Sequence, residues 1–196
     1  MERQQTIKNE VSISGVGLHT GNKVTLNFKP APINHGISFK RIDLESQPII
    51  EASASYVTET ERSTTICKNG VKIQTPEHLL AACAGLKIDN ILIEINAEEP
   101  PIMDGSSKFF VDALEKAGLK ELSSLRNEYI VKDIISFNDP ESGSEITVIP
   151  SENYQITTMV DYETKVLGTQ NATPVSYTHL RAHETVLDLV CRLLLE

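Results

Sequence analysis

The sequence predicts an α+β protein. We expect a two-layer sheet-plus-helices domain with a small inserted hairpin sheet, followed by the opening strands of a second, similar domain. Three observations predict this class: strand-like alternation comes first, two helical segments follow it, and the N-terminal strand pattern returns after residue 125. Strands that are followed by helices within one unit are typical of α+β domains, and a repeated pattern indicates a repeated unit.

Three strands are expected in the N-terminal segment. Apolar and polar residues roughly alternate over 6–13, they alternate cleanly over 24–28, and a third strand is expected at 37–42. Between the first two lies the segment 14–21 (SGVGLHTG), whose three glycines allow backbone angles and close approaches that side chains would block. The segment is either a loop that cradles an anion or a plain tight turn, and its composition favours neither.

A hairpin and a helix are expected next. Residues 63–75 are predicted to form a small sheet, because Asn69-Gly70 supplies the positive φ angles of a two-residue hairpin turn. The segment 75–85 (TPEHLLAACAG) has Thr75 as N-cap, Pro76 at the first helical position and a glycine near its end. These signals predict the first helix.

A strand at 90–95 and a second helix complete the first predicted domain, 1–125. The helix should begin within 104–107, after the Pro100-Pro101 break, and continue to residue 117 or 118. Its spacing predicts a buried face made of Phe110, Ala113, Leu114 and Ala117.

The second predicted domain begins at residue 126. Segments 130–137, 146–150 and 156–161 repeat, in order, the three N-terminal strand patterns. The similarity is weak in identity and good in pattern. We therefore expect 126–173 to be a truncated start of a repeated domain, which has its opening strands and does not reach its helices.

Composition restricts the classes of partner. The 196 residues carry a formal net charge of −9, which argues against nucleic-acid binding because phosphate contacts rely on clustered Lys and Arg. Neither a signal peptide nor a transmembrane segment is readable, so a cytoplasmic location is expected. Cys67, Cys83 and Cys191 are widely spaced, which fits free thiols in a reducing compartment.

The pair Glu77-His78 is the main candidate for chemistry. A carboxylate beside an imidazole suits a general base next to a metal ligand. An acidic residue in a first turn is also favoured by the helix dipole alone, and a lone His is more often packed or solvated than a ligand. Asp104, in the segment 101–107 (PIMDGSS), could face a site, but a loop that caps the second helix explains this segment better.

The tail 174–196 is set apart from the fold. His179 and His183 would share one helix face, but at about 100° per residue Asp188 lies far round the helix from both. Glu184 follows His183 without completing the HExxH pattern of zinc hydrolases. The tail looks like translated adapter or misassembled sequence rather than native chain, and we expect no metal site in it.

Four motifs in one order resemble those of the UDP-3-O-acyl-N-acetylglucosamine deacetylases: segments 14–21, 75–82 (TPEHLLAA), 89–90 (DN) and 101–106 (PIMDGS). The resemblance covers residues 1 to about 173 and is closest to the form fused to a hydroxyacyl-carrier-protein dehydratase. It implies a zinc-dependent amidohydrolase that converts UDP-3-O-(hydroxyacyl)-N-acetylglucosamine to the free amine and acetate, the committed step of lipid A biosynthesis. It also implies two similar domains with zinc at their junction.

The resemblance implies roles for four residues. It makes His78 a zinc ligand and Glu77 the general base that deprotonates the metal-bound water, and it places Leu18 and His19 near the UDP-linked acylated glucosamine. The family's other ligands, a His and an Asp of the second domain, its His general acid and its oxyanion Thr have no counterpart here. We therefore expect the chain to be inactive alone. The alternative is a non-catalytic α+β module that binds a nucleotide-sugar or a partner, in which Glu77-His78 merely starts a helix.

Overall fold

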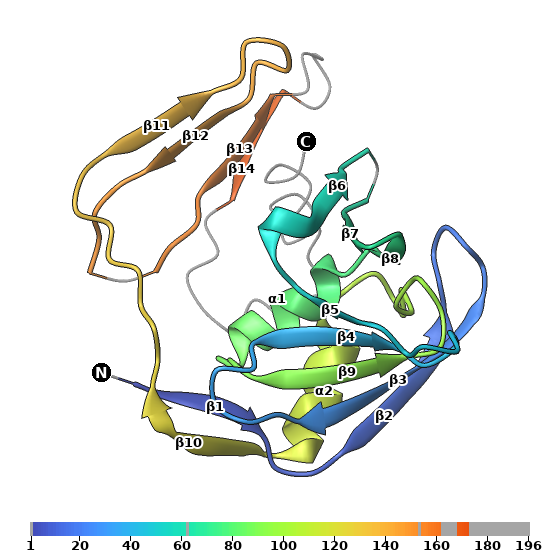
Figure 1. Ribbon diagram of the computed structural model, residues 1–196. Coiled ribbons are helices and arrows are strands. Elements are labelled where there is room, and N and C mark those ends of the chain that lie inside the picture. The colour runs from blue at the N-terminus through green and yellow to red at the C-terminus, as the bar shows by residue number, and fades with distance from the viewer. Residues whose placement is uncertain (1, 62, 153, 162–167, 173–196) are drawn as a thin grey trace.

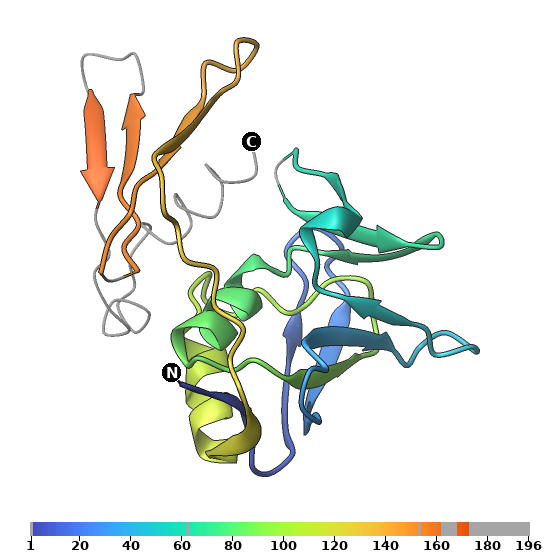
Figure 2. The same ribbon diagram turned by 60° about the vertical axis from the view of Figure 1, so that its left-hand side comes forward.

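A computed structural model describes residues 2–61, 63–152, 154–161 and 168–172. Its main body is a five-stranded sheet with two α-helices on one face, which confirms the predicted α+β class (Figures 1 and 2). The strand order is β2 (Val11–Val16), β3 (Lys23–Pro30), β9 (Ile91–Ile95), β4 (Ile37–Arg41) and β5 (Ile49–Glu51). Strands β4 and β9 run parallel, and the other neighbours are antiparallel.

The strand expected over 6–13 is wrong as a single element. The structure divides this stretch into β1 (Arg3–Ile7) and β2, and β1 pairs with β10 (Leu119–Leu125) instead of joining the central sheet. The break has a physical cause: the backbone amides of Lys8 and Asn9 donate to the carbonyls of Gly118 and Ala117 at the end of the second helix. Apolar and polar residues alternate in the same way before and after this break. The alternation therefore does not reveal that β1 and β2 pair with different strands.

The predicted hairpin is confirmed. Strands β6 (Val57–Glu59), β7 (Thr65–Lys68) and β8 (Val71–Gln74) form a three-stranded sheet, preceded by a short 3-10 helix at Ala54–Tyr56. At the β7–β8 turn, φ is 52° at Asn69 and 79° at Gly70, as a two-residue turn of this type requires.

Helix α1 (Glu77–Gly85) begins later than expected, and Thr75 is not its N-cap. Pro76 occupies that position, because its carbonyl accepts the first helical hydrogen bond from Leu80. The Thr75 hydroxyl donates instead to Glu99, outside the helix. The helix ends at Gly85, as the glycine near its end predicted, and Lys87, two residues further on, has a left-handed φ of 56°.

Helix α2 (Lys108–Ala117) matches the prediction closely. Ser107 is the N-cap and Gly118, with φ 73°, is the C-cap. The four residues predicted for the buried face are buried, and Val111 joins them. Apart from Ala113, these residues join Leu79 of α1 and Phe28 and Phe39 of the sheet in the core between the two layers, where each large side chain contributes roughly 1.5–3 kcal/mol.

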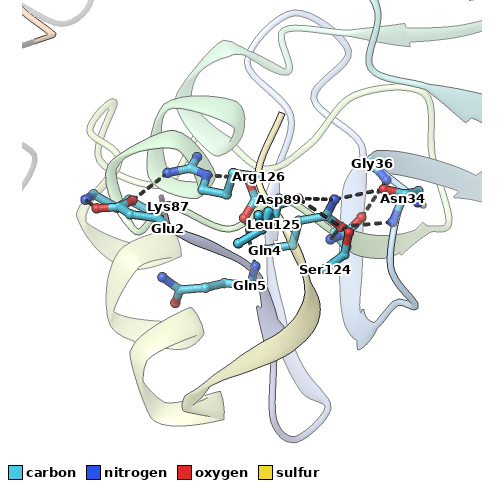
Figure 3. A network of polar contacts seen from close by, with 11 residues as sticks. Glu2, Gln4, Gln5, Asn34, Gly36, Lys87, Asp89, Ser124, Leu125 and Arg126 are labelled. Atoms are coloured by element: carbon cyan, nitrogen blue, oxygen red, sulfur yellow. Dashed lines mark hydrogen bonds and ion pairs between the residues drawn. The ribbon is translucent and has the colours of Figure 1, made fainter. Parts of the chain in front are cut away.

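Strands β1 and β10 close the first unit, and Asp89 holds them to its body (Figure 3). One Asp89 oxygen accepts from the Gln5 backbone amide at 2.7 Å, and the other accepts from Arg126 Nε at 2.8 Å. Arg126 follows β10 directly and also pairs with Glu2 at 3.1 Å. We call this arrangement the β1–β10 clasp.

The neighbouring Asn90 is buried and links the clasp to the central sheet. Its amide nitrogen donates to Gln4 Oε1 at 2.9 Å, and its oxygen accepts from the Gly36 amide at 3.0 Å. Gln4 also donates to the Leu125 carbonyl at 3.2 Å. The Asp-Asn motif that precedes β9 therefore joins both ends of the unit to its sheet.

Two hairpins follow the clasp. Strand β11 (Ile135–Asn138) pairs with β12 (Glu145–Val148), and β13 (Thr158–Asp161) pairs with β14 (Thr169–Ala172). In order along the chain, the antiparallel pair β11–β12 corresponds to β2–β3, and the antiparallel pair β13–β14 corresponds to β4–β5. In the first unit, β9 lies between those two pairs and joins them, and the described residues after 126 contain no equivalent strand. The hairpins therefore remain separate sheets, with apolar residues such as Phe137 exposed at 64%. The domain boundaries stay a prediction.

Candidate functional site

Glu77 begins α1 with a carboxylate that is only partly satisfied. Its Oε1 accepts from the Thr64 backbone amide at 3.5 Å, which is a long contact. Its Oε2 is buried and has no hydrogen-bond partner among the described residues, and the hydroxyl of Thr64 is in the same condition. A buried carboxylate oxygen without a donor is costly, so such an atom indicates a site where a proton or a ligand is handled. His78 follows on the next helical position and is half-buried.

The segment 14–21 differs from the expected loop. Residues 14–16 belong to β2, and only 17–22 form a turn, closed by hydrogen bonds from Gly17 to Asn22 and from Gly21 to Gly17. Two of its glycines nevertheless provide the close backbone approach and the positive φ angle that were expected of this segment. A Cβ at Gly17 would lie 2.5 Å from Glu99 Oε2, and Gly21 has φ +65°.

The turn does cradle an anion, and that anion is the chain's own Glu99. The backbone amide of His19 donates to both carboxylate oxygens at 3.0 and 3.1 Å, and the Thr20 amide donates to Oε2 at 2.9 Å. The hydroxyls of Thr20 and Thr75 add bonds of 2.8 and 3.1 Å. These backbone donors are therefore already occupied and are not offered to a substrate phosphate.

Glu99 is almost fully buried, at 1% exposed, and its carboxylate accepts five hydrogen bonds. Burial raises the pKa of its carboxyl, but the hydrogen bonds from Thr20, His19 and Thr75 outweigh burial and hold the pKa below its usual value. Sequence reasoning missed this residue. The glycine-rich segment gave no sign of which carboxylate its backbone amides bind, because Glu99 lies about eighty residues away in the sequence.

Leu18 and His19 are exposed, Leu18 at 52%. Glu99 binds the turn that carries Leu18 and His19, and it also binds Thr75, which lies two residues before Glu77. No described contact tests their roles, which stay predictions.

Segment 101–106 packs on β2 and caps α2. A Cβ at Gly15 would lie 2.8 Å from Pro101 Cβ, and the Ile102 amide donates to the Val16 carbonyl. Asp104 accepts from the amide and hydroxyl of Ser106, whose oxygen accepts from the Lys108 amide at the start of the helix. This geometry supports the capping interpretation of Asp104.

Within the described residues, no group of three His, Cys, Asp or Glu side chains is placed to hold a metal ion. His78 is the single zinc ligand that the resemblance assigns. The described part of the chain therefore supplies one of the roughly three protein ligands that a catalytic zinc ion needs. His179, His183, Glu184 and Asp188 lie outside the described residues.

Cys67 and Cys83 are free thiols, as predicted, and Cys191 lies outside the described residues. Burial raises the pKa of the Cys83 thiol to about 12, so this cysteine is an inert core residue. Neither α1 nor α2, the α-helices of the described residues, has the length and apolar character that a membrane-spanning helix requires.

The described residues form an α+β unit, and the two strand pairings after residue 126 follow the order of the pairings β2–β3 and β4–β5 within it. Residues 4–185 match the family described as "LpxC: UDP-3-O-acyl N-acetylglycosamine deacetylase", and the chain belongs to this family. The match extends to residue 185, into the tail 174–196 that was expected to be non-native sequence.

Named relatives support the same assignment. The chain is 47% identical over 173 residues to "Bifunctional enzyme LpxC/FabZ" of Bacteroides thetaiotaomicron, covering 88% of this chain and 38% of that protein. It is 43% identical to the Chlorobaculum tepidum protein of the same name, covering 86% and 36%. It is 41% identical to "UDP-3-O-acyl-N-acetylglucosamine deacetylase" of Chromohalobacter salexigens, covering 88% and 56%. The chain thus spans between 36% and 56% of these relatives.

Proposed function

We propose that the protein carrying this sequence removes the N-acetyl group from UDP-3-O-(hydroxyacyl)-N-acetylglucosamine, as a zinc-dependent amidohydrolase of lipid A biosynthesis. The family and the names of the relatives support the reaction. The observation in this chain that carries the proposal is the buried, unpartnered Oε2 of Glu77 beside His78 at the start of α1.

Glu77 is the general base in this proposal. A water oxygen forms a bond to the acetamide carbonyl carbon while its proton passes to Glu77 Oε2, which holds no other hydrogen bond among the described residues. The carbon–nitrogen bond then breaks, the amine nitrogen gains a proton, and acetate leaves. The long Thr64 contact on Oε1 keeps the carboxylate in place without competing for Oε2.

His78 is a zinc ligand in this proposal, and the remaining ligands come from outside the described residues. Zinc, when bound, supplies a Lewis acid that polarises the carbonyl and lowers the pKa of water. Leu18 and His19 contact the substrate from the exposed side of their turn. We also infer a cytoplasmic location and a C-terminal fused dehydratase, the latter supported by the relatives named bifunctional.

The test compares Glu77→Gln and His78→Ala with wild type in a full-length protein that carries this sequence. We expect Glu77→Gln to lower the rate of acetate release by about 10²–10⁴ while bound zinc stays at the wild-type level, because only proton transfer is lost. His78→Ala should lower both zinc content and rate. Near-normal deacetylation by Glu77→Gln would contradict the role of Glu77, and a wild type that binds the UDP-sugar without releasing acetate would favour the non-catalytic module.

A further inference from the structure

Two segments far apart in the sequence meet at the buried carboxylate of Glu99. On one side, the turn 17–22 provides the His19 amide, the Thr20 amide and the Thr20 hydroxyl, at 2.8–3.1 Å. On the other side, Thr75 provides its hydroxyl at 3.1 Å. Since hydrogen bonds to a charged acceptor are the strong ones, these contacts hold the two segments in a fixed relation.

Thr75 is in a conformation that needs such support. Its φ is +51°, in the left-handed region that β-branched residues rarely enter. Its amide donates to the Thr64 carbonyl at 2.8 Å, and its hydroxyl donates to Glu99. The backbone at Thr75 sets the direction in which the chain enters α1, so it sets the position of Glu77.

The chain beside Glu99 is attached to the same place. The Gln74 amide donates to the Glu98 carbonyl at 2.8 Å, immediately before Thr75 meets Glu99. On the opposite side, Gly17 approaches the contact so closely that a Cβ there would lie 2.5 Å from Glu99 Oε2 and from Thr20 Oγ1. The turn side of the contact is thus closely packed, and the Thr75 side is held by a backbone hydrogen bond.

We propose that Glu99 is a positioning residue, which fixes the turn that carries Leu18 and His19 relative to the Glu77-His78 pair. The inference rests on the proposed function. Its two sides should have separable effects, because the turn carries the predicted substrate contacts and α1 carries the predicted base. Loosening the Thr20 side should weaken substrate binding, and loosening the Thr75 side should slow the chemical step.

The experiment measures kcat, KM and zinc content in the full-length protein carrying this sequence, per folded molecule. Thr20→Val and Thr75→Val each remove one hydroxyl while keeping the branched shape, whereas Thr20→Ser and Thr75→Ser keep the hydroxyl. We expect Thr20→Val to raise KM about tenfold with kcat nearly unchanged, and Thr75→Val to lower kcat about tenfold with KM nearly unchanged. The serine variants should restore both constants, and Glu99→Gln should change both without loss of zinc.

Asp89→Asn is the matched control. Asp89 is a half-buried carboxylate that accepts hydrogen bonds of 2.7 and 2.8 Å, close in length to those of the more deeply buried Glu99, but it lies in the β1–β10 clasp beyond the other end of α1. It should lower stability and leave kcat and KM unchanged. Valine variants that lose stability but keep wild-type kcat and KM would overturn the positioning role. A wild type that releases no acetate would overturn the proposed function itself, and the positioning role with it.

Discussion

Replacing Gly17 by alanine should lower the free energy of unfolding more than an alanine at either of the other two glycines of segment 14–21. The new Cβ would lie 2.5 Å from both Glu99 Oε2 and Thr20 Oγ1, a separation that real Cβ atoms do not show. The turn or the Glu99 carboxylate must then shift, and the hydrogen bonds from the His19 and Thr20 amides to the carboxylate are lost. At about 1.5–3 kcal/mol for each bond to a charged group, the free energy of unfolding should fall by about 3–6 kcal/mol.

Gly21 and Gly15 provide the controls. A Cβ at Gly21 meets no atom within 4 Å, so Gly21→Ala should cost only the left-handed backbone conformation, about 1–2 kcal/mol. Gly15→Ala presses on Pro101 Cβ at 2.8 Å and should cost about 1–3 kcal/mol. Urea unfolding followed by far-UV circular dichroism gives the three values, since the chain has no Trp. A Gly17→Ala variant as stable as Gly21→Ala would refute the reasoning.

Three further outcomes are expected. Because the pKa of Glu99 lies below the unfolded value of 4.5, its contribution to stability is present above that pH and lost as the pH falls through the folded pKa. The urea midpoint of the wild type should thus fall more steeply between about pH 5 and about pH 3 than that of Glu99→Gln, and parallel curves would contradict this. Iodoacetamide should label Cys67 in the folded protein and reach Cys83 only in urea, as peptide mapping can check, because burial raises the pKa of Cys83 to about 12. The chain as given should lose zinc on dialysis, since its described residues contain no three-ligand group. Stoichiometric zinc that disappears with His78→Ala would show that a complete site is present.

Local signals in the sequence predicted the elements that local physics decides. Asn69-Gly70 fixed the β7–β8 turn, and the spacing of Phe110, Ala113, Leu114 and Ala117 gave the buried face of α2. Partner choice was not predictable from such signals. Apolar and polar residues alternate through β1 and on into β2, but β1 pairs with β10, more than a hundred residues away in the sequence.

The candidate site shows the same division. The Glu77-His78 pair stood out by its place at a helix start, and α1 does begin there. Thr75 has the residue type of an N-cap, yet it serves Glu99 instead, because a buried carboxylate competes for its hydroxyl. Glu99 itself looks like any acidic residue near a proline pair, and only the tertiary contact with the turn 17–22 reveals it.

The strand order of the central sheet dictates the order in which the protein can fold. Strand β9 is synthesised after β2–β3 and β4–β5, yet it lies between them, so the two strand pairs cannot be joined into one sheet until residue 95 is available. Closing such a non-local, partly parallel pairing is slow compared with forming hairpins. During that interval the edges of β3 and β4 are unpaired and open to another chain, which makes this the stage of synthesis at which aggregation competes with folding.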